Sequence, residues 1–139
     1  MPALFSIVGQ KGSPKSEVLA GLVETLSRRG LKVGVIKCLR RDDFEIEDTN
    51  TDTFLYRKKG AHRVVLAGRN KMAVFSTLKE QCSLEALRGH FEGFDVVFTQ
   101  GYSKDSVSSI EVESDFPFEN LETLAFAIEQ KVLAQKSGV

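Results

Sequence analysis

The stretch at residues 9–16 constrains the fold of this chain more than any other part of the sequence. It reads Gly-Gln-Lys-Gly-Ser-Pro-Lys-Ser and follows an apolar run, Ala3–Val8, that is typical of a buried strand. Apolar residues at helical spacing follow it, which predicts a strand, a loop and a helix in that order. This is the arrangement of a Walker A loop, G-x-x-x-x-G-K-[ST]. In such a loop backbone N–H groups cradle phosphates, the lysine contacts the β/γ oxygens and the hydroxyl holds Mg²⁺.

The second glycine of that motif is replaced by Pro14. Proline has no N–H and its φ is fixed near −65°. Losing one charge-assisted hydrogen bond of about 1.5–3 kcal/mol would weaken nucleotide binding by about 10- to 100-fold. The helix dipole, the lysine and the remaining amides would keep an anion site. The residues predicted to bind phosphate are Gly9, Gly12, Ser13, Lys15 and Ser16. A structural alternative stays open, because Ser13 as N-cap with Pro14 at the first helical position starts a helix well in any protein.

The rest of the chain alternates apolar strands with helices. The first helix is expected to end at Arg28-Arg29-Gly30, a cationic last turn followed by glycine. Further strands are predicted at Val33–Lys37, 62–67, Met72–Ser76, 94–99 and 109–113, and further helices at 52–59, 83–90 and from 120 onward. This order predicts an α/β fold of the P-loop NTPase-like class. We expect a mostly parallel sheet with helices on both faces, and a single domain over residues 1–139.

The composition of the chain excludes several classes of function. The chain has 139 residues, with 19 basic and 19 acidic side chains, so neither a general nucleic-acid role nor a membrane-surface role has electrostatic support. No stretch approaches the roughly 20 apolar residues of a membrane helix, and no signal peptide is predicted. Cys38 and Cys82 are the only cysteines and form no CxxC pair, which favours a reducing cytoplasm.

A second group of candidate residues follows the predicted strands. P-loop proteins commonly carry a carboxylate at the end of the strand here assigned to 94–99, but this chain has Gln100. A glutamine amide can bind water, yet it is a weak metal ligand and no base; a simple turn at Gln100-Gly101 is the structural alternative. Arg40 and Arg41 are expected at the carboxyl edge of the sheet, where ligands bind in open α/β folds.

In collinear order, the chain resembles the family of molybdopterin-guanine dinucleotide biosynthesis protein B (MobB) from Leu4 to Val112. SIVGQKGSPKS resembles the family's strand and P-loop, and LSRRGLKVGVIK its helix end and second strand. DFEIEDTNTDTFLYRKKGA resembles its Asp–Gly-Lys-Asp-Ser segment and the helix after it. LEALRGHFEGFDVVFTQGYSKDSVSSIEV resembles the stretch ending in its Glu-Gly-Phe/Tyr-Lys turn and Ile-Glu-Val strand.

The resemblance implies a GTP-binding, often dimeric protein with weak GTPase activity. It would assist the guanylyltransferase that attaches GMP to molybdopterin. Gly9, Gly12, Lys15 and Ser16 would form the phosphate cradle, and Ser16 would also meet Mg²⁺. Lys37 closes the second strand as in the family, and Asp52 matches a family aspartate that is a second candidate for the metal.

Departures from the family cluster where its chemistry should lie. Pro14 replaces the loop glycine, Gln100 replaces a glutamate, residues 38–41 replace a histidine-rich turn, and Asn50-Thr51 replaces Gly-Lys. The leading hypothesis is therefore an adapter that binds GTP or a molybdopterin-type ligand, through Lys15, Lys37, Arg40 and Arg41 among others, with weak or no hydrolysis. Two alternatives remain: an interaction module that has lost nucleotide binding, and a small NTPase that tolerates Pro14.

Overall fold

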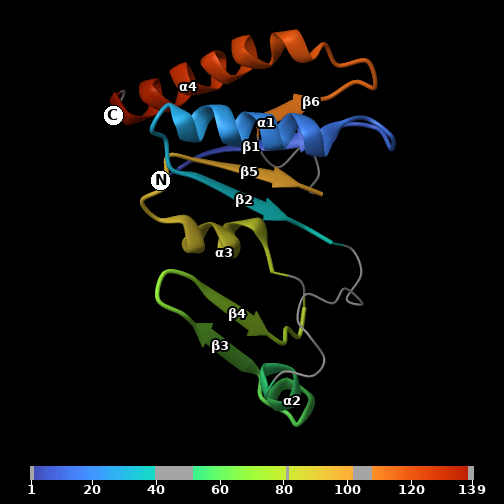
Figure 1. The fold of residues 1–139 in the computed structure, drawn as a ribbon, viewed down its shortest axis with the longest axis vertical. Coiled ribbons are helices and arrows are strands. Elements are labelled where there is room, and N and C mark those ends of the chain that lie inside the picture. The colour runs from blue at the N-terminus through green and yellow to red at the C-terminus, as the bar shows by residue number, and fades with distance from the viewer. Residues whose placement is uncertain (1, 40–51, 81, 102–107, 138–139) are drawn as a thin grey trace. The chain divides into compact units, whose positions relative to one another are not determined.

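The computed structural model describes residues 2–39, 52–80, 82–101 and 108–137 (Figure 1). The elements in chain order are β1 (Ala3–Val8), α1 (Lys15–Arg28), β2 (Val33–Lys37), α2 (Asp52–Lys58), β3 (Arg63–Ala67), β4 (Met72–Ser76), α3 (Leu84–Arg88), η1 (Gly89–Phe91), β5 (Val96–Gln100), β6 (Ser108–Glu111), η2 (Phe118–Asn120) and α4 (Leu121–Ser137). The contacts divide the chain into two compact units, residues 1–39 with 87–139 and residues 40–86.

The first unit is built on a parallel sheet of four strands in the order β2-β5-β1-β6 among the residues that the structure describes. β5 pairs with β1 on one side and with β2 on the other, and β6 lies at the edge beside β1. Because all four strands run the same way, their carboxyl ends meet at one edge of the sheet. The loop after β1 therefore lies at the edge where parallel sheets usually bind ligands.

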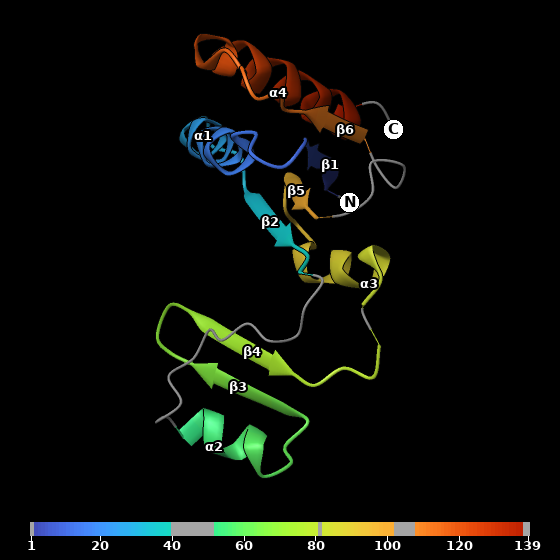
Figure 2. The same cartoon turned by 90° about the vertical axis from the view of Figure 1, so that its right-hand side faces the viewer.

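The hydrophobic core lies between this sheet and two helices, α1 and α4, which lie together over one face (Figure 2). Alternate residues of β1 and β5 point into it, as expected when only every second side chain of a strand faces a given layer. The buried core residues are Ala3, Phe5, Ile7, Val18, Leu19, Leu22, Leu26, Val96, Phe98, Val112, Ala125, Ile128 and Val132. On the opposite face, Gly34 leaves room for the Phe91 ring, which would lie only 2.4 Å from a Cβ atom at that position.

The end of α1 shows how local sequence sets an element boundary. Gly30 has a φ of +90°, and its N–H donates to the Ser27 carbonyl, while the Leu31 N–H donates to the Leu26 carbonyl. These two bonds form a Schellman motif, which needs a residue that tolerates left-handed backbone. The predicted stop at Arg28-Arg29-Gly30 is confirmed. Arg29 then donates to Glu129 at 2.6 Å and to Glu122 at 3.0 Å, which ties α1 to α4.

The second unit holds α2 and an antiparallel hairpin of β3 and β4. The register places Val64 opposite Phe75 and Val65 opposite Val74. The guanidinium of Arg57, on α2, lies 5.2 Å from the centre of the Phe75 ring, so α2 packs on the Val64–Phe75 face. No side chain of these three elements is fully buried.

The predicted α/β fold class is confirmed: the main sheet is parallel and helices pack on it. The element ranges agree to within two residues; the strand predicted at 94–99 is Val96–Gln100, and that predicted at 109–113 is Ser108–Glu111. The single-domain assignment stays a prediction beside the two units described here. No helix in the described part of the chain has the length and apolar character needed to cross a bilayer.

Candidate functional site

The loop between β1 and α1 is organised around Lys15. Its Nζ atom donates to the carbonyl oxygens of Gly9 at 3.1 Å and Gln10 at 2.9 Å, and to Ser13 Oγ at 3.1 Å. The first residue of α1 thus folds back over the loop that precedes it. Gly9 is required for this packing, because a Cβ atom there would lie 2.5 Å from the Val112 carbonyl oxygen and 2.6 Å from Ser13 Oγ. The loop therefore places an ammonium group against the carboxyl end of β1.

The loop also closes on itself through Ser13. The backbone N–H and the hydroxyl of Ser13 both donate to the Gln10 carbonyl, at 3.0 and 2.7 Å. The Lys15 N–H donates to the Ser13 carbonyl at 2.9 Å, and Pro14 has no N–H to offer. The backbone donors of three consecutive positions are thus not free to bind a phosphate in this conformation. Among the described residues, the N–H groups of Gly12, Ser16 and Glu17 have no backbone acceptor, as is usual at a helix N-terminus.

The structure corrects the expected start of α1. Ser13 was a candidate N-cap with Pro14 as the first helical residue, but the helix begins at Lys15 and no side chain caps it. Pro14 occupies the cap position with φ −82° and ψ 53°. The Ser13 hydroxyl donates to the Gln10 carbonyl and accepts no backbone N–H of the helix, because the left-handed turn at Gly12 (φ +93°) brings it to that carbonyl. The purely structural interpretation of Ser13 as a cap is therefore wrong.

Two further predicted residues lie at the same edge of the sheet. Gln100 ends β5 and pairs in register with Lys37, the last residue of β2, and with Ile7 of β1. The Cys38 N–H donates to the Gln100 carbonyl at 2.8 Å. Parallel pairing thus brings Lys37 and Gln100 to the edge that carries the loop.

Three other predicted site residues stay predictions. Arg40 and Arg41 lie outside the described residues, so their place at the site stays a prediction. Asp52 is the exposed first residue of α2, in the second unit, and its role also stays a prediction. His62, His90 and the two cysteines form no ligand set, since no group of three or more His, Cys, Asp or Glu side chains able to hold a metal occurs in the described ranges.

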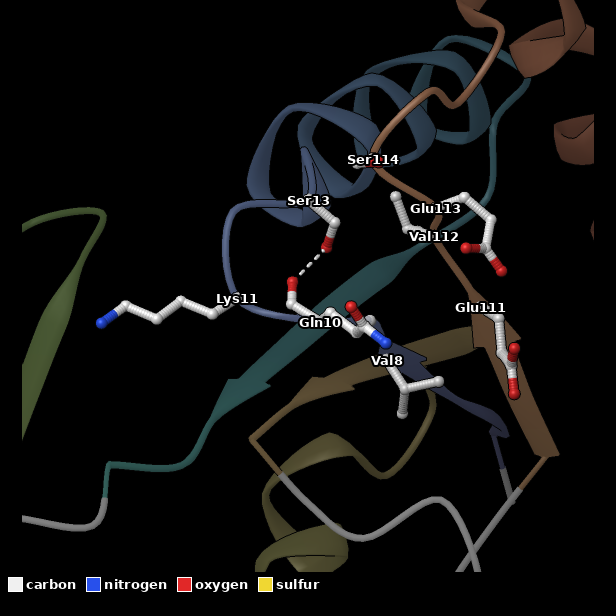
Figure 3. Close-up of a pocket in the computed structure, with 9 residues that line it drawn as sticks. Val8, Gln10, Lys11, Ser13, Glu111, Val112, Glu113 and Ser114 are labelled. Carbon is white, nitrogen blue, oxygen red and sulfur yellow. Dashed lines mark hydrogen bonds between the residues drawn. The ribbon is translucent and has the colours of Figure 1, made fainter.

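A pocket of about 330 Å³ opens beside the loop, on the side of β6 (Figure 3). The β1–β6 pairing continues past the strand, with the Val112 N–H donating to the Val8 carbonyl at 2.8 Å, and this brings residues 111–114 against the loop. Figure 3 shows the Lys11 side chain pointing away from Glu111 and Glu113. The pocket lining is Val8, Gly9, Gln10, Lys11, Ser13, Glu111, Val112, Glu113 and Ser114.

Sequence reasoning missed these carboxylates as site residues. Glu111 and Glu113 are about a hundred positions from the loop, and only the pairing of β6 with β1 places them there. The available signals were the alternation over 109–113, which predicted an edge strand, and the Ile-Glu-Val segment at its end. Neither signal indicates that this strand pairs with β1.

The fold and the loop together define the class: an α/β protein on the P-loop NTPase plan. The family model for molybdopterin guanine dinucleotide synthesis protein B matches residues 4–134, and the chain belongs to this MobB family.

Two curated relatives agree with that assignment. Both are molybdopterin-guanine dinucleotide biosynthesis adapter proteins. The one from Haemophilus influenzae is 26% identical over 109 residues, covering 77% of this chain and 61% of the relative. The one from Escherichia coli is 24% identical over 143 aligned residues, covering 100% of this chain and 80% of the relative. This chain thus spans less than two thirds of the Haemophilus relative.

Solved structures agree on the fold. A crystal structure of molybdopterin-guanine biosynthesis protein B has a TM-score of 0.74 at 23% identity, covering 93% of this chain and 98% of that one. Bacillus subtilis MobB has a TM-score of 0.59 at 20% identity, covering 87% and 70%.

Proposed function

We propose that this protein is an adapter in molybdopterin guanine dinucleotide biosynthesis that binds GTP or a molybdopterin-type ligand at the loop of residues 9–16. The observation that carries the proposal is the position of Lys15 over the carbonyls of Gly9 and Gln10, at the carboxyl edge of a parallel sheet. The ammonium group there can turn to a phosphate oxygen, and the free N–H groups at the start of α1 add donors to the same anion.

Hydrolysis is proposed to be weak or absent. Pro14 removes one cradle donor, and the local hydrogen bonds of Ser13 and Lys15 engage two more. Gln100 offers an amide where a carboxylate would bind the water of a metal ion, and an amide cannot accept a proton at neutral pH. Mg²⁺ is part of the proposal only as an ion carried by the nucleotide phosphates, with the Ser16 hydroxyl as the protein ligand. The described side chains supply no carboxylate set for it.

The proposal includes two protein partners, a molybdopterin guanylyltransferase and a second copy of this chain. The hairpin of the second unit supports the second copy. Val65 and Val74 face each other across the strands, and they are 53% and 46% exposed. Met72, next to them on the same face, is 72% exposed. An isolated two-stranded hairpin is marginally stable, so a partner on this face would supply the missing burial. We place the complex in the cytoplasm, in keeping with a sequence that has only two cysteines and no disulfide framework.

Isothermal titration with GTP and GDP, with and without Mg²⁺, tests the ligand half of the proposal. Lys15→Ala should weaken nucleotide binding by about 10- to 100-fold, because it removes a charge-assisted contact worth about 1.5–3 kcal/mol. Lys131→Ala is the matched control, since this exposed lysine lies on α4 and does not line the pocket. Absence of heat up to about millimolar nucleotide, with a folded protein, would favour the interaction module that has lost nucleotide binding.

A further inference from the structure

The pocket beside the loop has an apolar floor and two kinds of polar wall. The half-buried Val8, at the end of β1, provides the floor, while the Val112 side chain is buried in the core next to it. Figure 3 shows the Gln10 side-chain amide on one side of this floor and the carboxylates of Glu111 and Glu113 on the other. Convergent polar groups beside an apolar surface fix the orientation of small-molecule ligands, and about 330 Å³ is at the lower end of the usual range of ligand pockets.

The charges in this pocket favour a ligand that donates hydrogen bonds. Glu113 is an exposed residue of the pocket lining, and its ionised carboxylate only accepts hydrogen bonds. The Lys11 side chain points away from Glu111 and Glu113, and Lys15 is held over the loop by the carbonyls of Gly9 and Gln10. A phosphate would therefore bind at Lys15, while the β6 side of the pocket repels anions and attracts N–H groups.

We propose that the pocket binds the 2-amino-4-oxopyrimidine ring that guanine and pterins share. Glu113 accepts hydrogen bonds from the ring N–H and the 2-amino group, and the Gln10 amide donates to the 4-oxo group. The proposal rests on the proposed function, because the phosphate of the same ligand is assigned to the loop. It adds a residue that selects the ligand, and that residue lies on β6 rather than in the loop.

The donor pattern of the ring distinguishes it from other bases. Guanine presents a ring N–H next to an amino group, and a carboxylate can take both in one bidentate, charge-assisted contact. Adenine presents an unprotonated ring nitrogen at the equivalent position, so its lone pair would face the carboxylate of Glu113. A site that accepts hydrogen bonds from its ligand discriminates strongly against an analogue that lacks the donor. This discrimination is larger than that of an apolar pocket against an analogue that lacks one methylene group.

The test compares GMP with IMP, which lacks only the 2-amino group, by calorimetric titration of the full chain. Wild-type protein should bind GMP about 10- to 100-fold more tightly than IMP, as expected for one charge-assisted hydrogen bond. Glu113→Gln should bring the two affinities to within a few fold, because its amide replaces one acceptor oxygen by a donor. Glu92→Gln, an exposed glutamate after η1, is the matched control and should keep the wild-type preference.

A second pair of probes separates the two sources of the ring. Pterin and lumazine differ in the 2-amino group, and a preference for pterin that Glu113→Gln removes would identify a pterin ligand. Pyrophosphate tests the loop alone. Equal binding of GMP and IMP, and of pterin and lumazine, with pyrophosphate still bound, would overturn the pocket proposal and leave the proposed function intact. A preference that survives Glu113→Gln would overturn the role of Glu113. Failure of all these probes would overturn both proposals.

Discussion

Two hydroxyl groups lie fully buried on the face of the sheet opposite to α1 and α4. Ser6 of β1 and Thr99 of β5 pair in register, and alternation along both strands points them to the same side. Neither Ser6 Oγ nor Thr99 Oγ1 has a hydrogen-bond partner in the described residues. A buried polar group without a partner costs roughly 1–3 kcal/mol, so these side chains lower the stability of the strands that carry the site.

Thr99→Val should therefore stabilise the protein. Valine has nearly the same shape as threonine and removes the unpartnered hydroxyl, so we expect a gain of about 1 kcal/mol in the free energy of unfolding, measured by urea denaturation. Thr123→Val is the control. Thr123 is exposed on α4, and threonine and valine have similar helix propensities, so this change should leave the stability nearly unchanged. A loss of similar size at Thr99 would mean that its hydroxyl is hydrogen-bonded, for example to a buried water.

At the residue scale, the sequence predicted the strand–loop–helix order around Lys15 but not the hydrogen bonds within the loop. Lys15 and the strand–loop–helix context were visible because they are local. The closure of Ser13 on Gln10 was not, because it depends on the path of the chain at Gly12. The pocket residue Glu113 was also missed, because strand pairing that no local pattern encodes places it beside the loop.

At the scale of elements, Asp95 joins three of them just before β5. Its carboxylate accepts the Lys32 N–H at 2.6 Å, at the start of β2, and forms an ion pair with Lys136 near the end of α4. The hydrogen bond from Lys136, the Lys32 N–H and their charges hold the pKa of Asp95 below its ordinary value of 3.8, against a smaller opposite effect of burial. The ionised form is thus stabilised by folding.

The pH dependence of stability follows from the direction of that pKa shift. Since the folded pKa is below the unfolded one, the stabilisation is present above about pH 4 and is lost as the pH falls toward the folded pKa. Asp95→Asn should lower the urea midpoint at pH 7 and make stability fall less steeply between about pH 4 and pH 2. Asp115→Asn, an exposed aspartate in a turn, should change neither. A steeper acid loss in Asp95→Asn would contradict this account.

Elements were predictable where their signals are local, as at the Gly30 end of α1. The strand order β2-β5-β1-β6 was not, because it is set by pairings between distant segments. The strand predicted from Phe94 begins two residues later, since the Phe94 N–H donates to the Phe91 carbonyl in a turn and Asp95 bonds to Lys32.

At the scale of the whole molecule, the two units differ in how much they bury. The first has a core of aliphatic and phenylalanine side chains under two helices, whereas no residue of α2, β3 or β4 is fully buried. Composition predicted an ordinary globular chain but not this uneven distribution. The apolar face of the hairpin, Val65, Val74 and Met72, is the part of the second unit that a second copy is proposed to cover.

Val74→Lys should therefore shift the protein toward monomer. A lysine in the middle of an apolar interface leaves a buried charge without a partner, which costs several kcal/mol and lowers dimer affinity by about a hundredfold or more. Sedimentation velocity at several concentrations measures the change. Leu133→Lys on α4 is the matched control, because Val74 and Leu133 are both 46% exposed and only Val74 lies on the hairpin face. Wild-type protein that sediments as a monomer up to about 100 μM would remove the second copy from the proposal. A dimer that Leu133→Lys disrupts and Val74→Lys leaves intact would move the interface to α4, and the hairpin face would then need another partner.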